Sequence, residues 1–157
     1  MQKTLFSAAT LFLLATCGGG DPVGPSDVAC NTFLLEYGAA PVDTVTAAQG
    51  LKYIEITTGT GTVATTGMTV DVNYSGYLAA NANRFDTSCA AGVPVLRVPL
   101  GSGAVIPGFD LGIRGMKPGG VRRVIVPPAL GYGNVANGPI PANSTLVFDI
   151  ELVGFVD

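Results

Sequence analysis

The chain contains no histidine and no tryptophan, and charged residues make up only 12% of its 157 residues. Without histidine, catalytic triads, imidazole general bases and His-ligated zinc sites are excluded. The formal net charge of −3 argues against nucleic acid as a partner, because such binding needs a basic face. Two thiols, Cys30 and Cys89, without histidine or a further cysteine nearby make a poor metal site. We expect neither a metal ion nor a cofactor.

Glycine and proline, in contrast, are abundant: 22 and 11 residues indicate a chain with many turns. The length predicts one folded domain with additional segments. Residues 1–17 are interpreted as a signal peptide, since Lys3 precedes an apolar run that is too short to span a bilayer. Residues 18–49 then form a Gly/Pro-rich tether and an N-terminal arm. The domain itself is expected over residues 50–157.

The end of the signal segment, Leu14-Ala15-Thr16-Cys17, resembles the lipobox of bacterial lipoproteins, although Thr16 departs from the usual Gly, Ala or Ser. The resemblance implies that Cys17 is lipidated. It also implies a lipid anchor in a bacterial cell envelope, facing the periplasm or in the outer membrane. The alternative is an ordinary secretory signal in which Cys17 has no role.

Cys30 and Cys89 are the other two cysteines, and export would place them where disulfides form. A bridge between them would close a loop of about sixty residues and contribute roughly 4 kcal/mol. Two buried free thiols are the alternative.

Alternation of apolar and polar residues predicts strands in most of the domain. Only one segment, starting at Pro107, reads as a helix, and no parallel βαβ repeat is present. We therefore expect the α+β class, with an antiparallel sheet closing over one short helix. The predicted strands cover residues 51–57, 68–77, 95–100, 121–126 and 145–155, and a polar loop over residues 79–83 leads into Arg84-Phe85-Asp86-Thr87-Ser88.

The helix that starts at Pro107 places an apolar stripe on one face, made of Ile106, Phe109, Ile113 and Met116. Asp110 and Arg114, four residues apart, can pair on the opposite face, which we expect to be solvated. Free backbone N–H groups at an apolar helix start suit a ligand that is apolar and carries carbonyls. Two glycines in this helix each cost it about 1 kcal/mol against alanine.

Several short motifs occur in a fixed order from about Gly50 to Asp157, and together they resemble the tacrolimus-binding, FKBP-type family of peptidyl-prolyl isomerases. The resemblance implies a half-barrel of antiparallel strands wrapped around one short helix. The motifs are Asn73-Tyr74-Ser75-Gly76, Arg84-Phe85-Asp86-Thr87-Ser88, Pro99-Leu100-Gly101, Val105-Ile106-Pro107-Gly108-Phe109, Gly131-Tyr132-Gly133, Ile140-Pro141 and Thr145-Leu146-Val147-Phe148-Asp149.

The same resemblance implies a proline pocket and assigns its residues. The Ile106 N–H and the Tyr132 hydroxyl would donate to substrate carbonyls, Phe109 would form the floor, and Asp86 would lie near the twisting amide. The family often has an arginine that pairs with this aspartate where this chain has Ala91. The implied catalytic residues are Tyr74, Phe85, Asp86, Ile106, Phe109, Tyr132 and Phe148; the implied substrate-binding residues are Leu96, Val105 and Ile140.

The function expected from these residues is cis–trans isomerisation of X–Pro bonds in exported proteins. An isomerase of this kind needs no nucleophile, metal or proton transfer, which suits a chain without histidine. The alternative is a chaperone-like module that binds peptides through the same pocket with little turnover. The expected partners are proline-containing polypeptides and tacrolimus- or rapamycin-like macrolides, and the chain is expected to be a monomer.

Overall fold

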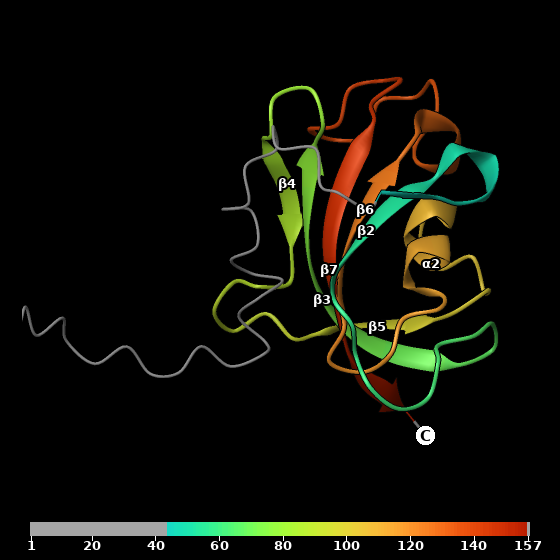
Figure 1. Ribbon diagram of the computed structural model, residues 1–157. Helices are drawn as coiled ribbons and strands as arrows, with labels where there is room; N and C mark the ends of the chain where they lie inside the picture. Colours follow the sequence, from blue (N-terminus) through green and yellow to red (C-terminus); the bar gives the residue numbers. More distant parts are fainter. Residues whose placement is uncertain (1–43, 157) are drawn as a thin grey trace, which may run out of the picture.

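Seven antiparallel strands form one sheet in residues 44–156, the part of the chain that the computed structural model describes (Figure 1). The strands follow the order β1-β2-β6-β7-β3-β4, and β5 pairs separately with β3. Their bounds are β1 Val45–Thr46, β2 Lys52–Thr57, β3 Thr69–Leu78, β4 Arg84–Thr87, β5 Leu96–Pro99, β6 Val121–Val126 and β7 Leu146–Val156.

One α-helix, α2 (Pro107–Ile113), lies across one face of the sheet (Figure 1). Its glycines explain how closely it packs on β6. A Cβ atom on Gly108 would lie 2.3 Å from Cγ1 of Val126, and one on Gly112 would lie 2.8 Å from Cγ2 of Val124. The two glycines that weaken the isolated helix therefore permit its contact with the sheet. Packing against the sheet stabilises a helix that its own helix propensity would not.

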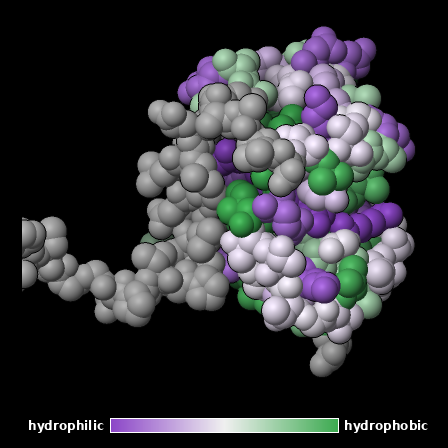
Figure 2. Space-filling model, viewed as in Figure 1, coloured by the Kyte–Doolittle hydropathy of each residue, from purple (hydrophilic) through white to green (hydrophobic). Residues whose placement is uncertain are grey.

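The apolar stripe of the predicted helix packs into a single hydrophobic core between α2 and the sheet. Phe109, Ile113 and Met116 are all buried there, together with alternate residues of β3, β6 and β7. The α+β fold is thus confirmed, with an open antiparallel sheet around one short α-helix in the described residues. Outside, hydrophobic residues occur in small separate groups on the face shown in Figure 2.

The structure differs from the sequence prediction at two boundaries. The helix ends at Ile113, because Arg114 has an extended backbone with ψ of 137°, so Met116 reaches the core from the following turn. The sheet also begins before residue 50, where Val45 pairs with Tyr53 across β1 and β2. Two 3₁₀ turns, η3 (Ala48–Gly50) and η4 (Pro128–Leu130), complete the described elements. None of the helices described here is long and apolar enough to cross a membrane.

Candidate active site

A cavity of about 300 Å³ opens between α2, the loop that precedes it and the strands β3, β4, β5 and β7. All but one of the residues assigned to the proline pocket from the sequence line it. Ala104 lines it too and was not predicted, because a small side chain beside a turn carries no pattern of its own. The lining residues are Tyr74, Phe85, Asp86, Leu96, Ala104, Val105, Ile106, Phe109, Tyr132 and Phe148.

Ile140 is the exception. It is only 4% exposed and belongs to the hydrophobic core, and it does not line the cavity. Its backbone pairs with Asn137, with a 2.9 Å hydrogen bond from each amide to the other residue's carbonyl. This short turn directs the Ile140 side chain inward, so the residue supports the loop that follows Tyr132.

Four aromatic rings from three strands and the helix make the floor of the cavity. Phe109 packs edge-to-face against Tyr74 and Phe148, with ring centroids 5.4 and 5.1 Å apart. Phe85 packs in the same way against Phe148, at 5.7 Å. Perpendicular rings at these distances are a favourable arrangement. The floor is therefore a rigid apolar surface that fits a saturated ring.

A β-bulge brings two consecutive residues of β4 into the cavity. Gly76 pairs with Asp86 and Tyr77 pairs with Arg84, which leaves Phe85 as the extra residue. In a regular strand neighbouring side chains point to opposite faces, whereas a bulge changes this direction. The close approach requires Gly76: a Cβ atom there would lie 2.8 Å from the Phe85 ring and 2.9 Å from the Phe148 ring.

Two hydrogen-bond donors at the cavity have no acceptor within residues 44–156. One is the amide of Ile106, the residue before α2, whose carbonyl accepts from Phe109 and Asp110 while its own N–H stays open. The other is the hydroxyl of Tyr132. Both residues line the cavity and are half-buried. Unpaired donors beside an apolar floor are unusual in a folded domain, and they suit a ligand that supplies carbonyl oxygens.

The Tyr74 hydroxyl, by contrast, is already engaged. It donates a 2.6 Å hydrogen bond to Oδ2 of Asp86, and the other carboxylate oxygen accepts from the Thr87 amide at 2.9 Å. Burial raises the pKa of Tyr74 well above its usual value, and the Asp86 carboxylate raises this pKa further. Tyr74 therefore stays protonated and keeps Asp86 in a fixed orientation at the cavity.

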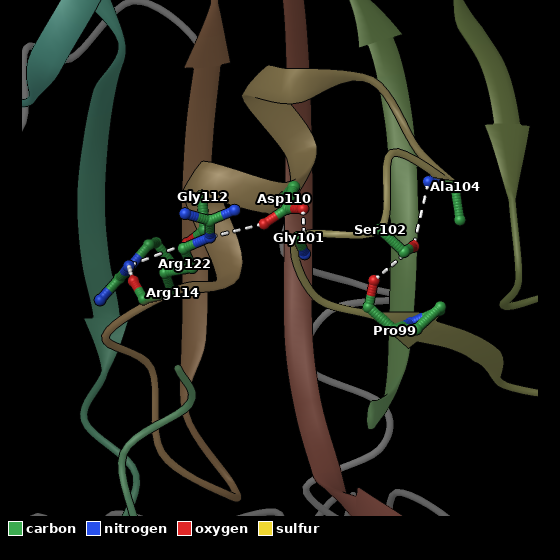
Figure 3. A network of polar contacts seen from close by, with 8 residues as sticks. All are labelled: Pro99, Gly101, Ser102, Ala104, Asp110, Gly112, Arg114 and Arg122. Carbon is green, nitrogen blue, oxygen red and sulfur yellow. Dashed lines mark hydrogen bonds and ion pairs between the residues drawn. The ribbon is translucent and has the colours of Figure 1, made fainter. Parts of the chain in front are cut away.

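A polar network lies around α2 and the loop that precedes it, next to the cavity (Figure 3). Oδ2 of Asp110 accepts from the Gly101 amide at 2.7 Å, and Oδ1 accepts from Nε of Arg114, also at 2.7 Å. Arg122, from β6, donates to the carbonyls of Gly112 and Arg114. The expectation of a solvated Asp110–Arg114 pair was wrong: Asp110 is only 6% exposed, because the loop from Gly101 folds over it.

Cys89 follows β4 and is disulfide-bonded. Its Sγ atom lies 3.6 Å from the carbonyl oxygen of Tyr74. Cys30 and Cys17 lie outside the described residues, so the pairing of Cys30 with Cys89 and the lipidation of Cys17 stay predictions.

Comparison with known proteins identifies the family. Residues 61–153 match the model of the FKBP-type peptidyl-prolyl cis-trans isomerases, a range that contains the whole cavity. The chain belongs to this family. The FK506-binding protein 1A of Neurospora crassa is 45% identical, over 71% of this chain and 92% of its own length. The crystal structure of FkpA from Escherichia coli superimposes with a TM-score of 0.67 at 38% identity, over 74% of this chain and 53% of that one.

Other relatives correct the expected location. The 46 kDa FK506-binding nuclear protein of Spodoptera frugiperda is 45% identical over 67% of this chain. Further curated relatives come from Candida albicans, Mycosarcoma maydis and Neurospora crassa. These eukaryotic relatives, one of them named a nuclear protein, contradict the predicted place in a bacterial cell envelope. That prediction rested on a four-residue lipobox-like pattern with one departure, Thr16, which is too short to decide a location. The chain spans about a quarter of the length of such relatives, 25% for the nuclear protein.

Proposed function

We propose that this FKBP-type domain accelerates the cis–trans rotation of X–Pro bonds in polypeptides. The observation that carries the proposal is the combination of an aromatic floor with two open donors, Ile106 N–H and Tyr132 hydroxyl, in one cavity. The uncatalysed rotation takes tens to hundreds of seconds, because amide resonance sets a barrier of about 18–20 kcal/mol. A site that favours the twisted amide over both planar forms lowers this barrier.

In the proposed mechanism, the proline ring packs on Phe109 between Tyr74 and Phe148 and stays fixed. The two donors hold peptide carbonyls on either side of the ring, so the bond that rotates is the one between them. The apolar walls remove water from the amide, and a less solvated amide loses its planar, charge-separated form more readily. No covalent bond forms or breaks in this scheme.

Tacrolimus- and rapamycin-like macrolides are proposed as competing ligands of the same cavity. Several relatives carry FK506 binding in their names. A macrolide of this class presents an apolar ring flanked by carbonyls, which matches the floor and the two donors. Competition by tacrolimus would therefore place catalysis in this cavity.

The test is a protease-coupled isomerisation assay on the full chain with an X–Pro peptide, with and without tacrolimus. We expect acceleration over the uncatalysed rate, and its loss when tacrolimus is added. Tyr132→Phe should reduce kcat/KM about tenfold, because one donor is lost. Tyr53→Phe, which removes a hydroxyl outside the cavity, should not. No acceleration by the folded wild-type chain would overturn the isomerase; tacrolimus binding without turnover would instead support the peptide-binding alternative.

Four further features stay predictions. Residues 1–17 as a signal segment and acylation at Cys17 are tested by mass spectrometry of the protein made in cells, which gives the mature N-terminus and any acyl mass. A bridge between Cys30 and Cys89 is tested by peptide mapping before and after reduction. Sedimentation of the full chain tests whether it is a monomer.

A further inference from the structure

One carboxylate supplies the only charge among the residues that line the cavity. Asp86 is exposed, while the other nine lining residues are uncharged. Its two oxygens each accept one hydrogen bond, from the Tyr74 hydroxyl and the Thr87 amide. Neither donor is a cation, so these bonds orient the negative charge and leave it uncompensated.

No cation within residues 44–156 compensates this charge. The ion pairs described there bind other carboxylates: Arg97 with Asp71, Arg114 with Asp110, Arg122 with Glu55 and Arg123 with Asp149. Arg84 is the nearest arginine along the chain, and it makes no ion pair with Asp86. The bulge at Phe85 separates the two: Arg84 lies opposite Tyr77 on β3, and Asp86 lies opposite Gly76.

The carboxylate lies close to where the rotating bond would be. Its partner Tyr74 packs against Phe109, with ring centroids 5.4 Å apart, and Phe109 is the proposed platform for the proline ring. In an X–Pro segment the ring nitrogen is bonded directly to the carbonyl of X. In the proposed binding mode X would therefore lie next to the rotating bond, and its side chain would leave the cavity at the rim, where Asp86 is exposed.

We propose that Asp86 makes this site favour a cationic X, lysine or arginine, over a neutral side chain of the same shape. The inference rests on the proposed isomerase function and names its substrate class. Attraction between charges at an exposed rim is weakened by water and salt, so the selectivity is modest. We expect a preference of about two- to fivefold for a cationic X over a neutral side chain of the same shape. Glutamate at X should be disfavoured against glutamine.

The experiment compares two peptides that differ only in charge, with arginine or its neutral isostere citrulline before the proline. Exchange NMR on the full chain measures kcat/KM for each without a coupling protease. We expect a ratio of about two to five at low ionic strength, falling towards one as salt is added. Asp86→Asn should bring the ratio to about one. Asp71→Asn, which makes the same chemical change outside the cavity, should leave the ratio as in the wild type.

The outcomes separate this inference from the function on which it rests. Acceleration of both peptides with a ratio of one in the wild-type chain overturns the selectivity and leaves the isomerase intact. A ratio that Asp86→Asn does not change overturns the role of Asp86. No acceleration of either peptide contradicts the proposed function itself.

Discussion

Two aspartates near the cavity differ in exposure and in partners: Asp86 lines the cavity, whereas Asp110 does not line it but bonds the loop that forms another of its walls. Asp110, on α2, is only 6% exposed and bonds the Gly101 amide and the Arg114 guanidinium. Asp86, on β4, is exposed and faces the cavity without a cation in the described residues. The Asp110 carboxylate is thus bonded on both oxygens within the fold, including to a cation, whereas the negative charge of Asp86 is available to a ligand.

Asp110 stabilises the fold around the cavity, whereas Asp86 is free to act on a ligand. The wall that contains Ala104, Val105 and Ile106 is a loop without regular structure, so side-chain bonds from Asp110 must hold it in place. The wall that contains Phe85 and Asp86 belongs to a paired strand, which the sheet already holds. The bulged strand can therefore carry a carboxylate that bonds no cation. The carboxylate of Asp110, in contrast, is needed to hold the loop wall.

Asp110→Ala should give the largest effect, because it removes the acceptor that holds the loop wall. We expect the free energy of unfolding to fall by about 2–3 kcal/mol, since the Gly101 amide and the half-buried Arg114 guanidinium lose their shared, buried acceptor. Urea denaturation measures this loss, and kcat/KM should fall with it as Ile106 moves. Asp110→Asn, which keeps an acceptor for Gly101, should lose less.

Ser102→Ala is the matched control for Asp110→Ala. The Ser102 hydroxyl accepts from Ala104 and donates to Pro99 in the same loop, but it is exposed. A change below about 0.5 kcal/mol is expected for it. An equal loss for Ser102→Ala and Asp110→Ala would show that burial of the carboxylate has no special importance.

Much of this arrangement could be predicted from the sequence, and the exceptions have a common cause. Strand and helix positions follow local periodicity, and most lining residues followed from the family resemblance. Asp110 was misjudged because its burial depends on a loop nine residues earlier in the chain. Ile140 was misplaced for a similar reason: the short turn with Asn137 rotates it into the core. Contacts made by irregular loops leave no periodic pattern in a sequence.

Gly76→Ala should give the second largest effect, at the wall that contains Phe85 and Asp86. The added methyl group would lie within 3 Å of the Phe85 and Phe148 rings, so the bulge or the rings must shift. We expect a loss of about 1–2 kcal/mol in stability and a larger relative loss in kcat/KM, because the floor is displaced. Gly154→Ala on β7, where nothing lies within 4 Å, is the control. Equal kcat/KM for the two variants would contradict the role assigned to Gly76.

Asp86→Asn should give the smallest effect on stability, within about 0.5 kcal/mol at neutral pH, because the exposed carboxylate holds no cation. The measurable effect of Asp86→Asn is instead on the pKa of Tyr74. Burial is the main cause that raises this pKa, and the Asp86 carboxylate raises it further. Removal of the charge should lower this pKa, yet leave it above the ordinary value of about 10. Tyrosinate absorbance, with Tyr74→Phe subtracted, measures it.

The same pKa sets how stability changes at alkaline pH. In the unfolded chain Tyr74 ionises near pH 10, whereas in the native protein it stays protonated to higher pH. The native state therefore binds more protons above pH 10, and the stabilisation that is complete below this pH is lost as pH rises. Because Asp86→Asn lowers the native pKa, its stability should fall less steeply than that of the wild type. An equal slope would mean that the charge of Asp86 does not influence the pKa of Tyr74.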